Sequence, residues 1–262
     1  MATIALLTDF GTRDPYVAAM KGVIAARCDA RVADLSHDIP PFDVWAAAFF
    51  LRDVVPYWPA GTIFVAVIDP GVGTSRRILA VERDGRTFLA PDNGVLSLVV
   101  EDRQSCLSGQ AGLPVLHSVD NESLFLPNGS ATFHGRDRFA PVAAALANGL
   151  SLDELGPRID AIVALDYAPP SYDCARAEGT IVSVDRFGNL VTDIEAARLP
   201  FARYAAHAGA HVIERMARTY RDVAGAFLIT GSTGRVEISV AEASAAALLH
   251  LGRGDRVTIV PA

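Results

Sequence analysis

The stretch of residues 64–77, which reads FVAVIDPGVGTSRR, constrains the fold of this 262-residue chain more than any other. Residues 64–68 form an unbroken apolar and β-branched run, the pattern of a strand that is buried on both faces of a sheet. The run ends at Asp69, which is followed by a proline and a glycine, so a carboxylate lies where the strand leaves the sheet. Open α/β sheets bind ligands beyond the carboxyl ends of their strands, and the position of Asp69 therefore predicts a site.

Arg76 follows Asp69 across a turn that Gly71 and Gly73 allow to fold back. If the loop does fold back, the guanidinium meets the carboxylate, keeps it ionised and fixes its orientation. A purely structural ion pair is the competing interpretation of the same spacing.

The first half of the chain alternates strands with helices. A strand is predicted over residues 3–8, and it also ends in an acid, Asp9. Asp14 and Pro15 have the pattern of a helix start with a capping acid. Further elements are predicted as strands at 31–35 and 62–68 and as a helix at 44–57 that is capped by Asp43. This alternation predicts a mostly parallel α/β sandwich.

After residue 77 the pattern changes. Residues 78–82 and 87–90 flank Asp84 and Gly85, the signature of a tight hairpin. A short helix is predicted near residues 95–100. Residues 130–141, SATFHGRDRFAP, are dense in hydrogen-bonding groups and lead into a predicted helix at 142–148, which makes this segment a candidate site loop. It contains His134, whereas His37 in LSHDIPP is interpreted as a loop residue.

Two prolines, Pro169 and Pro170, separate this half from a region of shorter strands. We therefore predict an N-terminal α/β domain over residues 1–168 and a C-terminal β-barrel domain over residues 171–262. Strands of the second domain are predicted at residues 179–184, 190–194, 211–215, 226–230, 236–240 and 256–260.

Composition excludes several partners. The formal charge of −7 argues against nucleic acid and anionic membranes, which require a basic face. No window is long and apolar enough to span a bilayer, and the start of the chain reads as a strand, not a signal peptide, which favours the cytoplasm. The three cysteines, Cys28, Cys106 and Cys174, are interpreted as buried small hydrophobic residues. A small-molecule ligand remains.

Metal chemistry has weak support. His207 and His211 are four residues apart and Glu214 follows, which is ligand spacing if the segment is helical. Gly209 lies between the two histidines, and we predict no metal site. Asp9 and Asp69 have an ordinary alternative role as caps of turns or helices.

Six motifs in order resemble a known family. They are TDFGTRDPYV, IPPFDVWAAA, VIDPGVGTSRR, APDNGVL, SATFHGRDRFAPVAA and VDRFGNLVTDI. Together they are similar to the S-adenosyl-L-methionine hydroxide adenosyltransferases, which are related to fluorinase and chlorinase. The resemblance implies hydrolysis of S-adenosyl-L-methionine, with the (R)-sulfonium epimer favoured, to adenosine and L-methionine. It implies no cofactor, and a homotrimer whose sites lie between subunits.

The resemblance also implies roles for individual residues. The water-activating triad falls on Asp69, Arg76 and His134, and Asp9 matches the acid that holds the ribose hydroxyls. Further substrate contacts are implied at Asp14, Tyr16, Asp185, Phe187, Asn189 and Ser232.

Departures from the family pattern separate the possible activities. The halogenating relatives carry tyrosine where this chain has Asp69, and a tyrosine-serine pair in place of His134 and Gly135. A carboxylate repels a halide and accepts a hydrogen bond from water, so hydrolysis is favoured over halogenation. Asp193 stands where the family usually has asparagine, and Ala241 likewise. The remaining alternatives are a non-catalytic adenosine or S-adenosyl-L-methionine sensor and a metal hydrolase.

Overall fold

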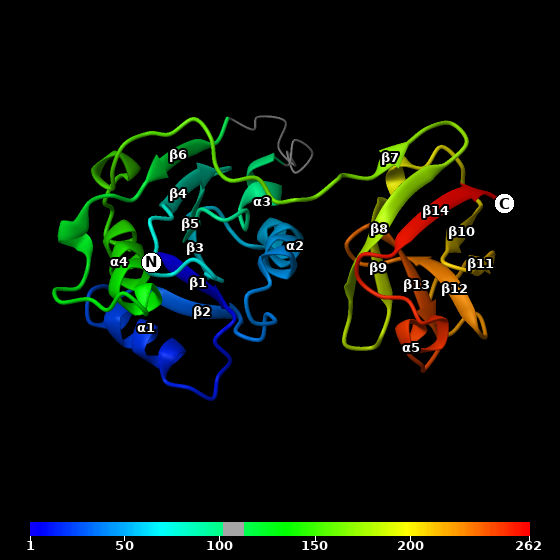
Figure 1. The fold of residues 1–262 in the computed structure, drawn as a ribbon, viewed down its shortest axis with the longest axis horizontal. Coiled ribbons are helices and arrows are strands. Elements are labelled where there is room, and N and C mark those ends of the chain that lie inside the picture. Colours follow the sequence, from blue (N-terminus) through cyan, green and yellow to red (C-terminus); the bar gives the residue numbers. More distant parts are fainter. Residues whose placement is uncertain (102–112) are drawn as a thin grey trace. The chain divides into compact units, whose positions relative to one another are not determined.

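The computed structural model describes residues 1–101 and 113–262, which divide into two compact units, Met1–Asp166 and Tyr167–Ala262 (Figure 1). Cys106 lies outside the described residues. Cys28 is half-buried, but the prediction of burial is wrong for Cys174, which is exposed. Cys174 lies in an exposed turn, in which the Asp173 carboxylate accepts the backbone N–H groups of Ala175 and Arg176.

The first unit contains a six-stranded sheet in the order β2-β1-β3-β5-β4-β6. The β2-β1, β1-β3 and β3-β5 pairings are parallel, whereas β4 and β6 add antiparallel pairings at one side. The predictions of a mostly parallel sheet and of a hairpin between β4 and β5 are confirmed. The strands are β1 (Thr3–Thr8), β2 (Arg31–Ser36), β3 (Thr62–Val67), β4 (Ile78–Arg83), β5 (Arg86–Pro91) and β6 (Val115–Ser118).

Helices cover both faces of this sheet, because successive side chains of its central strands point to opposite sides. Ile4 and Leu6 of β1 pack with α1 (Tyr16–Ala25) and α4 (Ala140–Ala147) in one apolar cluster. The alternate residues of β1 pack on the other face with α2 (Val44–Val54) and α3 (Ser97–Glu101). Figure 1 shows these two helix pairs on opposite sides of the strands.

The first residues of α2 confirm the predicted cap, whereas those of α1 do not. Asp43 caps α2 as predicted, its Oδ1 accepting the Ala46 N–H at 2.9 Å. Asp14 does not cap α1, because Pro15 occupies the capping position and Tyr16 is the first helical residue. Short turns of helix complete the unit at Val55–Tyr57, Glu122–Leu124 and Leu152–Glu154, and a π-helical turn spans Gly135–Phe139.

The second unit is an antiparallel barrel-like sheet, as predicted. Its strand order is β11-β10-β14-β8-β9-β13-β12, with β7 beside β8, and one apolar cluster fills its interior. Three short elements are not predicted from the sequence: β7, which has two residues, β10, and the five-residue α5 (Ala245–Leu249). β10 is rich in alanine and so lacks a β-branched signal. The strands are β7 (Ser171–Tyr172), β8 (Ala177–Val184), β9 (Leu190–Glu195), β10 (Tyr204–Ala208), β11 (His211–Ile213), β12 (Ala226–Thr230), β13 (Arg235–Val240) and β14 (Arg256–Pro261).

The histidine pair at positions 207 and 211 does not have helical geometry. His207 lies on β10 and His211 on β11, and the two strands form an antiparallel hairpin. Gly209, with φ of 56°, allows the turn between them. His211 contacts the Leu249 carbonyl through Nε2 at 3.0 Å. His207 and His211 therefore do not lie on one face of a helix, which the metal-ligand interpretation requires.

Residues 1–101 and 113–262 lack two features, a metal-binding cluster and a membrane-spanning helix. These residues contain no cluster of three His, Cys, Asp or Glu residues arranged to hold a metal ion. They also contain no helix with the length and apolar character needed to cross a bilayer.

The core of the first unit yields a stability prediction. Phe64 on β3 is 1% exposed and stacks on Phe88 of β5 with ring centroids 5.0 Å apart. Phe64→Ala removes this contact and leaves a cavity, so we expect the free energy of unfolding to fall by about 3–5 kcal/mol. Tyr57→Ala, at a side chain that is 76% exposed, is the control and should change it by at most about 0.5 kcal/mol. Urea unfolding of both variants measures the difference, and equal losses would contradict the assigned core.

Candidate active site

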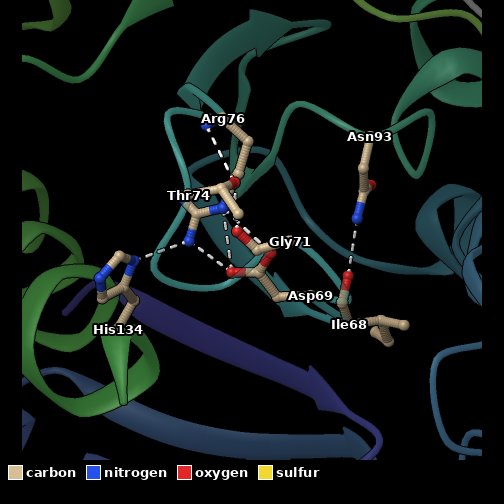
Figure 2. Close-up of polar contacts among 7 residues, drawn as sticks. All are labelled: Ile68, Asp69, Gly71, Thr74, Arg76, Asn93 and His134. Atoms are coloured by element: carbon tan, nitrogen blue, oxygen red, sulfur yellow. Dashed lines mark hydrogen bonds and ion pairs between the residues drawn. The ribbon is translucent and has the colours of Figure 1, made fainter. Parts of the chain in front are cut away.

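Asp69 lies directly beyond the carboxyl end of β3, as the sequence predicts. Asn93 holds the strand end in place, because its Nδ2 donates to the Ile68 carbonyl at 2.9 Å (Figure 2). In the neighbouring strand, Thr8 pairs in register with Val67. Asp9 and Asp69 therefore leave adjacent parallel strands at the same edge of the sheet.

The loop after Asp69 folds back on itself. The Thr74 hydroxyl donates to the Gly71 carbonyl at 2.7 Å and accepts the Arg76 N–H at 3.3 Å. Gly73 adopts a φ of 81°, and a Cβ there would lie 2.7 Å from the Ala131 carbonyl oxygen. The loop thus packs closely against the segment that carries His134, and only glycine fits at that point.

Arg76 and Asp69 form a buried ion pair. Arg76 Nε lies 3.0 Å from each Asp69 oxygen, and Nη2 makes a further short contact with Oδ2. The side chains are 9% and 5% exposed. The predicted meeting of guanidinium and carboxylate is confirmed. Such a pair is costly to break, since removal of either partner leaves an uncompensated buried charge.

His134 is the third member of the cluster. Its Nδ1 lies 2.9 Å from Arg76 Nη2 (Figure 2), and the residue is 2% exposed. A guanidinium is only a donor, so Nδ1 accepts and the ring proton is on Nε2. Within the described residues, Nε2 is buried without a hydrogen-bond partner.

The environment of His134 favours the neutral ring. Burial lowers the pKa of His134, and the positive charges of Arg138 and Arg76 lower it further, while Asp69 acts in the opposite direction. The imidazole therefore stays neutral at pH values where an exposed histidine is partly charged.

A buried acid fixes the loop that presents His134. Asp137 accepts the Ser130 N–H at 2.7 Å and two hydrogen bonds from Arg136 at 2.6 and 2.9 Å. The side-chain hydrogen bond from Arg136 is the main reason that the pKa of Asp137 is lowered. His134 immediately precedes the π-helical turn, a rare geometry that is frequent at functional sites. The sequence pattern predicts this loop as part of the site, but it does not single out Asp137, Asn93 or Thr74.

The other predicted residues of the first unit lie near the same strand edge. Asp9 Oδ2 accepts the Phe42 N–H at 2.8 Å. Tyr16 packs edge-on against Phe133, the residue before His134, with ring centroids 5.1 Å apart. Asp14 is exposed.

The predicted residues of the second unit fall into two turns. Asp185 accepts the N–H groups of Phe187 and Asn189 at 2.9 and 2.8 Å, and its other oxygen accepts the Asn189 side-chain amide at 2.8 Å. Asn189 is buried, whereas the Phe187 ring is 77% exposed. Ser232 is exposed in the separate turn between β12 and β13.

Asp193, the departure from the family pattern, is buried in the second unit. Its Oδ1 accepts the Thr180 N–H at 2.8 Å and its Oδ2 accepts the Tyr167 hydroxyl at 3.1 Å. A Cβ at Gly179 would lie 2.2 Å from Oδ1, so the carboxylate fits only against a glycine. Asp193 therefore has an internal structural role.

The fold and site define a two-unit chain with an acid, a guanidinium and an imidazole at the end of a parallel strand, and comparison with known proteins identifies the family. A model of the SAM hydroxide adenosyltransferase N-terminal domain matches residues 4–156, and the C-terminal domain model matches residues 179–258. This chain belongs to that family.

Individual relatives agree with the family match. The chain is 37% identical to the (R)-S-adenosyl-L-methionine hydrolase of Thermus thermophilus, over 99% of this chain and 100% of the relative. A fluorinase of an Actinoplanes species is more distant, 27% identical over 73% of this chain and 71% of its own. The crystal structure of an uncharacterized conserved protein from Thermotoga maritima matches with a TM-score of 0.89 and 33% identity, covering 98% of this chain and 99% of that one.

Gly73 provides a test of the loop geometry. Gly73→Ala places a methyl group against the Ala131 carbonyl and requires a φ of 81° that alanine rarely adopts. We expect a loss of at least about 1–3 kcal/mol in the free energy of unfolding. Gly234→Ala, at a φ of 78° but with open space around the Cβ, is the matched control. Chemical denaturation should show a larger loss for Gly73→Ala; equal losses would mean that the loop does not pack against residue 131.

The pKa of His134 yields a pH prediction. Because this pKa lies below its ordinary value in the folded protein, the unfolded chain takes up a proton that the folded chain resists. The contribution of neutral His134 to the free energy of unfolding is fully present above about pH 6.5, the ordinary histidine pKa, and is lost as the pH falls through the pKa of the folded protein. His134→Gln should flatten this acid decline in the free energy of unfolding, whereas His207→Gln, at an exposed position, should leave it intact. Denaturation curves from pH 7.5 to 5 that change equally in both variants would contradict the assignment.

Proposed function

We propose that this chain hydrolyses S-adenosyl-L-methionine, with the (R)-sulfonium epimer as the favoured substrate, to adenosine and L-methionine. The observation that carries this proposal is the buried carboxylate of Asp69 at the end of β3, oriented by Arg76. Membership of the SAM hydroxide adenosyltransferase family and the 37% identity to a relative named (R)-S-adenosyl-L-methionine hydrolase support it.

The reaction is a substitution at the ribose 5′ carbon. A water oxygen forms a bond to C5′ while the C5′–S bond breaks and its electron pair stays on sulfur. Methionine leaves with a neutral thioether, so the leaving group requires no general acid. The attacking water loses one proton and becomes the 5′ hydroxyl of adenosine. No redox or group-carrying cofactor enters this balance.

We assign the proton to Asp69. A carboxylate is too weak a base to convert bulk water to hydroxide beforehand, since water has a pKa near 15.7. As the C–O bond forms, however, the water oxygen becomes strongly acidic and transfer to a carboxylate becomes favourable. Asp69 accepts a hydrogen bond from water throughout, and general-base assistance of this kind contributes about 10²–10⁴-fold.

His134 serves a different role in this scheme. Its Nδ1 lone pair is engaged by Arg76, so the ring is not available as the base at that nitrogen. The Nε2–H remains a donor that can hold the water or a ribose oxygen. Arg76, between the two, contacts both Asp69 oxygens and holds the carboxylate in its orientation.

Orientation supplies the larger share of the expected acceleration. Placing the water in line with the C5′–S bond is worth up to about 7–11 kcal/mol. We propose that Asp9 sets this line by holding the ribose hydroxyls. The proposed contacts to the rest of the substrate come from Asp14, Tyr16, Asp185, Phe187, Asn189 and Ser232. As the resemblance implies, we propose a homotrimer. We also propose that the protein acts in the cytoplasm.

Asp69 also disfavours the halogenase alternative. A halide 4 Å from a carboxylate experiences a repulsion of about 4 kcal/mol at an effective dielectric constant of 20. Water is neutral and experiences no such penalty. Supply of chloride or fluoride should therefore yield no 5′-halo-5′-deoxyadenosine.

Product analysis tests the function directly. Purified protein is incubated with each sulfonium epimer, and chromatography should detect adenosine and methionine. Asp69→Asn should lower kcat by about 10²–10⁴-fold, because the amide cannot accept the proton. Asp29→Asn, an exposed aspartate before β2 and away from the strand edge that carries the site, is the control and should retain full activity. Folded protein that gives no adenosine from either epimer, as a non-catalytic sensor would, overturns the proposal.

A further inference from the structure

A buried network of polar side chains lies beside Asp9 and has no part in the mechanism above. Thr8, the last residue of β1, is fully buried, and its Oγ1 lies 2.8 Å from Nδ1 of His37, which is also buried. His37 Nε2 lies 3.0 Å from Asp34 Oδ1, and Asp34 Oδ2 accepts a 2.6 Å hydrogen bond from Lys21. The contacts join β1, β2, α1 and the segment after β2.

The direction of each hydrogen bond in this polar network follows from its donors and acceptors. His37 Nε2 is at ion-pair distance from Asp34 Oδ1 but without hydrogen-bond geometry, and the negative charge of the carboxylate favours a proton on this nitrogen. Burial on its own would raise the pKa of Asp34, but Lys21 and His37 outweigh it, so the pKa is lowered and the carboxylate is ionised. His37 Nδ1 then accepts a hydrogen bond from the Thr8 hydroxyl. The same hydroxyl oxygen accepts the Phe10 N–H at 3.3 Å.

These contacts hold the backbone on both sides of Asp9. Thr8 and Phe10 are tied to the His37 side chain through the Thr8 hydroxyl. Gly11 donates its N–H to the His37 carbonyl at 2.8 Å. The Asp9 carboxylate itself accepts the N–H of Phe42, in the segment that follows His37, at 2.8 Å.

We propose that His37 is a positioning residue for Asp9: through Thr8 and Gly11 it sets the direction of the carboxylate that binds the ribose hydroxyls. This inference rests on the proposed function, in which Asp9 holds the ribose. His37 touches no substrate. Its effect is to reduce the freedom of residues 8–11, so that the Asp9 oxygens are preorganised for a vicinal diol.

Replacements at Thr8 and His37 test the hydroxyl and the two ring nitrogens of the polar network separately. Thr8→Val removes the hydroxyl at nearly constant volume, and Thr8→Ser restores it. His37→Gln keeps an amide near the Nε2 position and loses the acceptor for Thr8, whereas His37→Asn places an acceptor near the Nδ1 position. Positioning of Asp9 therefore requires the hydroxyl and the Nδ1-side acceptor, and Thr8→Ser and His37→Asn should retain it.

The experiment measures binding of adenosine and of 2′,3′-dideoxyadenosine by calorimetry, which requires no turnover. Wild-type protein, Thr8→Ser and His37→Asn should prefer adenosine by about 10-fold or more, the effect of hydrogen bonds to a charged group. Thr8→Val and His37→Gln should lose most of this preference while binding the dideoxynucleoside normally. A merely structural defect would weaken both ligands equally, and that outcome overturns the proposal.

The two proposals fail in different ways. If the wild-type protein discriminates between the two nucleosides and Thr8→Val does not, the positioning role stands even if no adenosine is formed from S-adenosyl-L-methionine. If Thr8→Val keeps the full preference while the wild-type protein hydrolyses the substrate, the function stands and the role of His37 is wrong. Thermal unfolding of each variant identifies any that does not fold. If Thr8→Val does not fold, Thr8→Ser and His37→Gln decide; if His37→Gln does not fold, Thr8→Ser and Thr8→Val decide.

Discussion

The site depends on one guanidinium that is shared between an acid and an imidazole. Arg76 contacts both oxygens of Asp69 and also Nδ1 of His134, so it joins the end of β3 to the loop before the π-helical turn. Each partner is almost fully buried. An unpaired carboxylate in that position would be strongly destabilising, and the arginine thus makes a charged site compatible with the interior of the unit.

The sheet explains why the reactive groups meet. Parallel strands in register deliver Asp9 and Asp69 to the same edge, and the helices α1 and α4 pack on the face beneath the His134 loop. The strands that end at the site are packed in apolar clusters on both faces of the sheet. Loops that must place atoms to within a fraction of an ångström are short or internally bonded, as the contacts of Thr74 and Asp137 show.

The sequence predicts those features that depend on local pattern. The buried run before Asp69, the hairpin at Asp84 and the return of Arg76 to Asp69 all follow from neighbouring residues, and all are observed. Acid-proline is a frequent helix start and predicts a cap at Asp14, but Pro15 occupies the capping position of α1 instead.

Other features depend on contacts between distant segments and could not be predicted from pattern. His134 is 58 positions from Arg76, and nothing near it specifies which ring nitrogen is engaged. The Asn93 amide binds the Ile68 carbonyl and the His37 carbonyl binds the Gly11 N–H, and no local pattern pairs residues so far apart in the sequence. The resemblance to a known family predicts that Asp69, Arg76 and His134 belong to one site. The structure shows that Arg76 lies between the other two and contacts both.

The protonation state of His134 tests this account most directly. Long-range proton–nitrogen correlation spectra of the folded protein report the tautomer of each of the six histidines, and His134→Gln identifies the signal of His134. With Arg76 donating to Nδ1, the spectrum at pH 7 should show a neutral ring with its proton on Nε2. A proton on Nδ1, or a charged imidazolium, would contradict the shared guanidinium on which the site depends.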